Sequence, residues 1–287
     1  MIAVFIKKCL HNLSKYLNFV FRFFGFRLIR IQSMYEDLNI YEERARPKPA
    51  RYLNIGAGNF RHPFWHNMDM PNKFYKNEQK KGIDIVYNLT SQIPFPLETD
   101  SLKLVYCSHV AEHLTDDDVA FFFREVFRCL RPRGYFRITC PDIDLEYEAY
   151  MRGDTLFWTW PTPWGTASRS IEQKFLEHFA TALTIGNSEQ SYHKFSDKDV
   201  KNVFDSLPKE KALSFFIKQI PNHLKYVYPE YHINWFNSKK LIRMLEEAGF
   251  KKVYESRFGQ SQSALLRNIQ LFDLTCPELT LYVECQK

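Results

Sequence analysis

The sequence has no CxxC pair, no internal repeat and no low-complexity segment. Its six cysteines are scattered along 287 residues, which argues against a disulfide scaffold or a zinc ribbon and suits a reducing compartment. The formal net charge of +6 is too small to indicate nucleic acid as a partner. Because 45% of the residues are hydrophobic, the chain can build one substantial core. We therefore expect a cytoplasmic globular protein that binds no nucleic acid.

Residues 1–34 contain no acidic side chain, whereas basic residues recur throughout them. These charges recur too often for a spanning helix, which needs about 20 mainly apolar residues. A helical wheel places Lys8 and Lys15 on one face and Leu10 and Leu17 on the other, so an amphipathic helix is predicted. It would lie on an anionic membrane surface, or pack on the rest of the protein or a partner. A cleaved targeting peptide is a third option, although no small-residue cleavage site is evident.

Residues 35–49 are predicted to be a linker, and residues 50–287 an α/β domain. Strands are expected at about 51–55, 65–69, 83–88, 102–107, 135–140, 251–256 and 279–285, with helices at 116–130 and 238–248. Such alternation predicts a mostly parallel sheet covered on both faces, with ligands bound at the carboxyl ends of its strands. Residues 145–235 are predicted to form a helical insertion between the fifth strand and the late helix.

A glycine pair follows the first predicted strand, in Gly56-Ala57-Gly58. Glycines permit a tight turn and close approach of the backbone to a ligand. Asp69 ends the second predicted strand, where a carboxylate can accept hydrogen bonds from both hydroxyls of a ribose. A lone GxG is a weak signal, so a plain strand-to-loop turn is the alternative.

Further motifs follow in a fixed order, namely Asn88-Leu89, Ile93-Pro94-Phe95, Ser101-Leu102-Lys103, Glu112-His113-Leu114 and Pro132-Arg133-Gly134. With the glycine pair and Asp69, this series resembles class I methyltransferases that use S-adenosylmethionine, over roughly residues 50–143 and 230–287. The short spacing from Gly58 to Asp69 resembles a subgroup associated with polysaccharide and glycan assembly. The resemblance implies a Rossmann-like seven-stranded, mostly parallel sheet with an antiparallel last strand, and S-adenosyl-L-methionine as cofactor.

The resemblance also implies a cofactor site made of Asn54, Gly56, Ala57, Gly58, Asp69, Asn88, Leu89 and Ser108. The first loop would face the methionine part of the cofactor, Asp69 the ribose, and Asn88 with Leu89 the adenine. Ser108 and His109 would lie near the sulfonium. Asn54, Phe60 and Asn88 depart from the commonest residues of the family, and the short spacing to Asp69 leaves room for only a short first helix.

Three candidates are expected for catalysis, namely His109, Asp142 and His232. His109 belongs to an HxxEH group with Glu112 and His113. Three roles remain open for this group, namely acid–base chemistry, a divalent metal site resembling the ExxEH group of small-RNA 2′-O-methyltransferases, and structural hydrogen bonding. Of these we predict no metal. Asp142 follows the fifth strand and is either a base or a turn residue. His232 precedes the late helix and is either functional or structural.

The expected reaction is O-methylation of a sugar hydroxyl on a glycan or lipid-linked glycan, with a sugar or glycan acceptor as partner. The insertion contains Trp158, Trp160 and Trp164, whose rings would either stack on sugar faces or build the insertion's own core. Alternatives are methylation of another small or lipid-like molecule, a non-catalytic cofactor-binding scaffold in glycan assembly, and RNA 2′-O-methylation. A membrane-surface helix would suit a lipid-linked acceptor.

Overall fold

The computed structural model describes residues 13, 16–24, 52–77, 79, 82–158, 169–184 and 194–287. The chain divides into two compact units, Met1–Arg44 and Ala45–Lys287. In the first unit, residues 16–23 are helical. The aromatic side chains of Phe19 and Phe23 are 79% and 89% exposed there, while Lys8, Leu10 and Lys15 of the predicted faces lie outside the described residues. No helix in the described ranges is long and apolar enough to cross a membrane.

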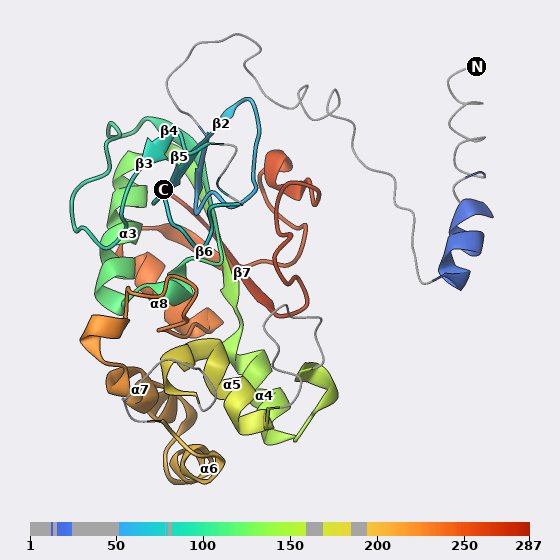
Figure 1. The fold of residues 1–287 in the computed structure, drawn as a ribbon. Coiled ribbons are helices and arrows are strands. Elements are labelled where there is room, and N and C mark those ends of the chain that lie inside the picture. Colours follow the sequence, from blue (N-terminus) through green and yellow to red (C-terminus); the bar gives the residue numbers. More distant parts are fainter. Residues whose placement is uncertain are drawn as a thin grey trace. The chain divides into compact units, whose positions relative to one another are not determined.

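The second unit is built on a seven-stranded sheet in the order β3-β2-β1-β4-β5-β7-β6 (Figure 1). Its strands are β1 Tyr52–Ile55, β2 Trp65–Asp69, β3 Ile85–Val86, β4 Leu102–Ser108, β5 Leu130–Pro141, β6 Lys251–Glu255 and β7 Thr280–Gln286. The first five strands pair in parallel, and β7 runs antiparallel to both β5 and β6. This confirms the predicted Rossmann-like sheet with an antiparallel last strand.

Two helices of the second unit match the predicted ones closely, α3 Asp116–Cys129 and α8 Ser238–Glu247. Each begins at a side-chain cap, because Thr115 accepts a hydrogen bond from the backbone of Asp118 and Asn237 accepts one from Lys240. The acidic first turn of α3 also complements the positive end of the helix dipole.

The insertion is helical, as predicted. Its helices are α4 Ile143–Met151, α5 Ile171–Ala180, α6 Asp197–Ser206 and α7 Lys209–Gln219. Figure 1 shows them grouped at the end of the sheet where β5 leads into α4. Short 3₁₀ turns complete the unit, at Ala111–His113, Leu156–Trp158, Thr181–Leu183, Asn222–Leu224 and Ala264–Arg267.

Three local expectations were wrong. The third strand shrinks to Ile85–Val86, because Asp84 bonds the backbone N–H of Asn67 through its side chain at 2.8 Å. The fifth strand begins at Leu130, so the Pro132 and Gly134 stretch is strand rather than loop. No helix lies between Gly58 and Asp69, where every residue is described and residues 57–64 form turns and coil.

Two hydrophobic clusters carry the second unit. One joins the sheet to α3 and α8, and the other lies wholly in the insertion and its flanks. The insertion cluster is rich in aromatic rings, among them Phe175, Phe204, Phe216 and Trp158, which is 4% exposed. Core formation therefore accounts for Trp158, whereas Trp160 and Trp164 lie outside the described residues.

An ionic cluster ties the C-terminal segment to the sheet. Arg137 on β5 is fully buried, with Nη2 2.6 Å from Asp273 and Nη1 3.6 Å from Glu284 on β7. The carbonyl oxygens of Arg257 and Gln260 and the hydroxyl of Ser256 accept further hydrogen bonds from it. Burial lowers the pKa of Arg137, but the two carboxylates outweigh it and raise that pKa, so the guanidinium stays charged.

Candidate functional site

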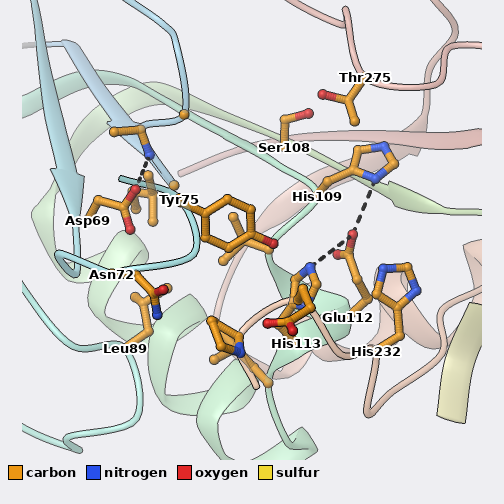
Figure 2. Close-up of a pocket in the computed structure, with 18 of the residues that line it drawn as sticks. Asp69, Asn72, Tyr75, Leu89, Ser108, His109, Glu112, His113, His232 and Thr275 are labelled. Atoms are coloured by element: carbon orange, nitrogen blue, oxygen red, sulfur yellow. Dashed lines mark hydrogen bonds and ion pairs between the residues drawn. The ribbon is translucent and has the colours of Figure 1, made fainter. Parts of the chain in front are cut away.

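One large cavity lies at the carboxyl ends of β1, β2 and β4, where a parallel sheet is expected to bind ligands. Its volume is about 1670 Å³, larger than the roughly 300–1,000 Å³ of an ordinary small-molecule pocket. Figure 2 shows Asp69 and Leu89 on one side of this cavity and His109, Glu112 and His232 on the other. The cavity therefore has room for a cofactor and a second molecule.

The glycine loop forms the wall of the cavity after β1. Gly56 has a φ of +78°, and a Cβ placed on it would lie 2.3 Å from the Val110 side chain. A larger residue at this position would meet both backbone strain and a clash. Gly58 also has a positive φ, +45°, but faces open space. The predicted reason for the glycines, a tight turn with close backbone approach, fits the geometry at Gly56.

Asn54 holds this loop rather than facing the cavity freely. Its side-chain Nδ2 donates to Asn67 Oδ1 at 3.1 Å and to the carbonyl oxygen of Ala57 at 3.5 Å. Asn67 in turn donates to the carbonyl oxygen of Phe60 at 3.0 Å. A carboxylate at position 54 could not donate these bonds, so the departure from the acid common in the family follows from the Asn67 partner.

Asp69 is fixed at the end of β2 by three donors. Its Oδ2 accepts from the backbone N–H of Ala57 at 2.9 Å and from Gln79 Nε2 at 3.1 Å, and its Oδ1 accepts from the N–H of Met70 at 2.7 Å. Figure 2 shows the carboxylate beside the glycine loop. Because Oδ1 accepts from a single donor among the residues that the structure describes, it retains a lone pair for a ligand hydroxyl.

Asn88 and Leu89 line the cavity on the same side as Asp69. Leu89 packs against the sheet core and offers an apolar surface. Asn88 Oδ1 accepts from both the N–H and the hydroxyl of Thr90, at 3.0 and 2.9 Å. Both lone pairs of that oxygen are therefore occupied, so the structure does not support Asn88 as acceptor for an adenine amino group. Its role in cofactor binding stays a prediction.

Ser108 and His109 follow each other at the end of β4. Ser108 Oγ accepts from the Thr139 hydroxyl at 2.8 Å. His109 has a φ of +53°, a conformation uncommon for residues other than glycine and frequent at functional sites. The Thr280 hydroxyl donates to main-chain carbonyls and so accepts from His109 Nε2 at 2.9 Å. Nδ1 of His109 lies 3.2 Å from Glu112 Oε1, so both ring nitrogens of His109 face protein atoms.

Glu112 is buried between three imidazole rings, with an exposed fraction of 1%. Its Oε1 lies 3.2 Å from His109 Nδ1 and 3.9 Å from His113 Nε2. Burial raises the pKa of Glu112, but the imidazoles of His109, His113 and His232 outweigh it and bring that pKa down to about 2. The carboxylate is therefore ionised at neutral pH.

His113 and His232 lie edge to face, with ring centroids 4.9 Å apart. Their ligand atoms and that of Glu112 all fall within 4.8 Å of one another. Burial, together with the neighbouring His113, lowers the pKa of His232 to about 3. His232 is therefore neutral at pH 7, and within the described part of the chain these three side chains form a group that could hold a metal ion.

The insertion contributes a second carboxylate–imidazole pair, Glu146 from α4 and His178 from α5. His178 Nδ1 lies 2.8 Å from Glu146 Oε1, and both residues line the cavity. Burial lowers the pKa of His178, but the adjacent Glu146 carboxylate outweighs it and raises that pKa above its ordinary value. The imidazole keeps 24% of its side chain exposed, so it can exchange a proton with a bound molecule.

The structure does not bring Asp142 to the cavity. Its Oδ1 accepts from the N–H of Asp144 at 3.0 Å and caps the start of α4. Burial raises the pKa of Asp142 to about 6, but its side chain is not among those lining the cavity. The prediction of Asp142 as a base is corrected to a helix cap, which was the turn-residue alternative.

His109 and His232 reach the cavity as predicted, and so do all eight predicted cofactor residues. Sequence reasoning missed the Glu146–His178 pair, because the two residues approach only through the packing of α4 on α5. No local motif marks either residue. The HxxEH group was visible as a motif, but its completion by His232 was not.

Residues 64–138 match the family model described as a methyltransferase domain. This match spans β2 to β5, including Asp69, Ser108 and the HxxEH group. No curated protein matches this chain.

Among solved structures, the chain is similar to S-adenosylmethionine-dependent methyltransferases from Thermotoga maritima, Archaeoglobus fulgidus and Mesorhizobium loti. The identities are 14%, 14% and 15%, and the TM-scores are 0.39, 0.38 and 0.36. The matches cover 84%, 83% and 84% of this chain and 84%, 86% and 94% of the others.

Proposed function

We propose that this chain, an S-adenosylmethionine-dependent methyltransferase of class I, O-methylates a sugar hydroxyl of a glycan or lipid-linked glycan. The observation that carries the choice of acceptor is the set of polar side chains that the insertion adds to the cavity lining. Besides Glu146 and His178, the insertion supplies Arg169, Glu177 and Thr181 to its lining. Charged side chains of both signs, together with a hydroxyl group, can donate and accept hydrogen bonds. They suit an acceptor with many hydroxyl groups better than an apolar acceptor.

The cofactor takes the side of the cavity with Asp69 in this proposal. The lone pair of Asp69 Oδ1 accepts a ribose hydroxyl, and the Gly56 turn lets the methionine part approach the backbone. Leu89 packs on the adenine ring. Ser108 and His109 then border the reacting methyl group, because Ser108 ends β4, His109 follows it, and both line the cavity.

Methyl transfer needs an acceptor oxygen in line with the sulfonium and a group that takes the hydroxyl proton. The oxygen forms a bond to the methyl carbon, the carbon–sulfur bond breaks, and its electron pair stays on sulfur. We assign His178 as the group that accepts the hydroxyl proton. The Glu146 carboxylate orients that imidazole and stabilises its charged form, so it accepts a proton more readily than an isolated histidine.

Methyl transfer to a panel of sugars, oligosaccharides and lipid-linked glycans tests this proposal. Mass spectrometry would detect the added methyl group on the acceptor, with quinone precursors and single-stranded RNA as comparison substrates. Transfer to sugar acceptors only is the expected result. Transfer restricted to a quinone precursor or to RNA would reject the sugar assignment, and no turnover with any acceptor would favour a cofactor-binding scaffold.

We also propose that the basic N-terminal segment lies on an anionic membrane surface, which would bring the enzyme to a lipid-linked acceptor. The exposed rings of Phe19 and Phe23 and the exposed Arg22 support this, since such segments combine aromatic anchors with basic residues. Sedimentation with phosphatidylserine vesicles should carry the full chain into the pellet. Phe19→Asp with Phe23→Asp should leave it in the supernatant, and equal sedimentation of both proteins would contradict the proposal.

A further inference from the structure

The Glu112, His113 and His232 side chains converge from separate parts of the chain onto one point of the cavity wall. Glu112 and His113 belong to the 3₁₀ turn after β4, and His232 lies in the segment that leads to α8. Their ligand atoms lie within 4.8 Å of one another. The backbone N–H of Ile233 donates to the carbonyl oxygen of Glu112 at 2.8 Å, which fixes the two segments against each other.

The Glu112 carboxylate is the unexplained member of this cluster. It is 1% exposed, and among the described residues neither of its oxygens has a hydrogen-bond partner. The contact to His109 Nδ1 at 3.2 Å is close enough for an ion pair but does not have hydrogen-bond geometry. Because a buried carboxylate without a hydrogen bond is costly, a ligand that satisfies its oxygens is expected beside it.

Both histidines of the cluster hold their other ring nitrogen in a fixed hydrogen bond. His113 Nδ1 donates to the carbonyl oxygen of Tyr231 at 3.0 Å, and His232 Nδ1 donates to that of His178 at 2.6 Å. A carbonyl oxygen can only accept, so Nδ1 carries the hydrogen in each ring. Each Nε2 is therefore left with a lone pair, and this arrangement is the usual one behind a metal-bound histidine.

We propose that Glu112, His113 and His232 bind a divalent transition-metal ion at the acceptor side of the cavity. Two imidazoles and one carboxylate suit zinc, cobalt, manganese or iron better than magnesium, which prefers oxygen ligands. Three protein ligands leave coordination positions open. The prediction of no metal among the site residues is replaced by this proposal.

The role of the ion rests on the proposed function. Its open positions would take the hydroxyl oxygens of the sugar, orienting the reacting one and lowering its pKa. The reacting hydroxyl would then sit where His178, whose carbonyl oxygen is bonded to His232, can take its proton, and the bonds made and broken are those of the transfer proposed above.

Titration of the full chain with Co²⁺ after chelator treatment tests the site without any acceptor. We expect one bound equivalent with visible absorption bands, displaced by Zn²⁺ and unaffected by Mg²⁺. Glu112→Gln and His232→Gln should each weaken Co²⁺ binding at least about 100-fold, since even an outer partner of a metal ligand is worth about 10–100-fold. The matched control is His223→Gln, because His223 is an exposed histidine outside the cavity lining, and it should bind like the parent.

Thermal melting of each variant establishes that it is folded. If Glu112→Gln does not fold, the comparison of His232→Gln with the parent tests the site. Absence of stoichiometric Co²⁺, Mn²⁺ and Zn²⁺ binding to the folded parent would overturn the site, as would equal binding by parent and both variants. If the protein binds no metal and still methylates sugars in the presence of chelator, the metal site is rejected and the proposed function stands. If the protein binds the metal but methylates no sugar, the metal site stands and the proposed sugar acceptor is rejected.

Discussion

His232 Nδ1 lies 2.6 Å from the carbonyl oxygen of His178, and this bond joins the loop before α8 to α5 of the insertion. His178 is itself paired with Glu146 on α4 at 2.8 Å. The orientation of His232, in the cavity wall, therefore depends on two helices of the insertion. An insertion that only covered the sheet would not need this connection. We therefore expect substitutions in α5 to change the rate of methyl transfer.

The pH dependence of methyl transfer should report the Glu146–His178 pair. Only the neutral imidazole accepts a proton, so the rate should fall by about tenfold per pH unit below the pKa of His178. That pKa is raised above its ordinary value of 6.5. As the pH is lowered, activity should therefore begin to fall while the pH is still above 6.5. Initial rates measured across pH would give the midpoint.

Glu146→Gln should move this midpoint to lower pH, because burial alone lowers the pKa of His178. Glu148→Gln is the matched control, since Glu148 lies on the same helix with 66% of its side chain exposed. An identical midpoint in Glu146→Gln and the parent would rule out His178 as the proton acceptor.

Asn54→Asp should destabilise the domain although the two side chains have nearly the same shape. The carboxylate would lose both donated hydrogen bonds and would face two acceptor oxygens, Asn67 Oδ1 and the Ala57 carbonyl. Loss of a buried donor costs about 1–3 kcal/mol in free energy of unfolding. Urea unfolding would measure this, with Asn72→Asp as control because the Asn72 side-chain oxygen accepts a hydrogen bond that a carboxylate can also accept. Equal losses in both variants would argue against the Asn54–Asn67 bond.

Gly56→Ala should abolish cofactor binding, whereas Gly58→Ala should only weaken it. A Cβ at Gly56 lies 2.3 Å from Val110, so the loop must shift away from Asp69. At Gly58 the added methyl meets nothing within 4 Å, and the left-handed backbone alone costs about 1–2 kcal/mol. Calorimetry with S-adenosylmethionine would separate the two, and equal affinities in both variants would contradict the close approach to Val110.

Asp273→Asn should strongly lower the free energy of unfolding without altering the Glu112, His113 and His232 cluster. It removes one carboxylate from the fully buried Arg137, and breaking a buried ion pair costs about 3–5 kcal/mol. The contrasting change is Glu148→Gln, which breaks an exposed pair with Arg152 worth less than about 1 kcal/mol. Thermal or urea unfolding would show the difference, and similar stabilities would mean that the buried pair is dispensable.

The elements that the sequence predicts well are those whose signal is local. The glycine loop, Asp69 at a strand end and the capped helix after Thr115 are each visible within a few residues, and all three are found in place. The short β3 depends instead on a bond between Asp84 and the backbone of Asn67, and the early start of β5 depends on pairing of Leu130 with Leu102. Such contacts join residues that no local pattern connects.

The same distinction separates the two sides of the candidate site. The predicted cofactor residues all line the cavity, because they follow successive parallel strands. The acceptor side is assembled from the turn after β4, the insertion helices and the loop before α8, so His178 and His232 gain their partners only by tertiary packing. Asp142 follows a strand as well, yet the start of α4 takes its carboxylate.

Calorimetric titration of the full chain with S-adenosylmethionine, beside Asp69→Ala, is the most direct test. The parent should bind one equivalent saturably, and the variant should bind at least about 100-fold more weakly, since a hydrogen bond to a charged group contributes about 1.5–3 kcal/mol and the Ala57 anchor of the loop is lost with it. No saturable binding to a folded parent, or equal affinity in parent and variant, would contradict a cofactor site built on the glycine loop and Asp69.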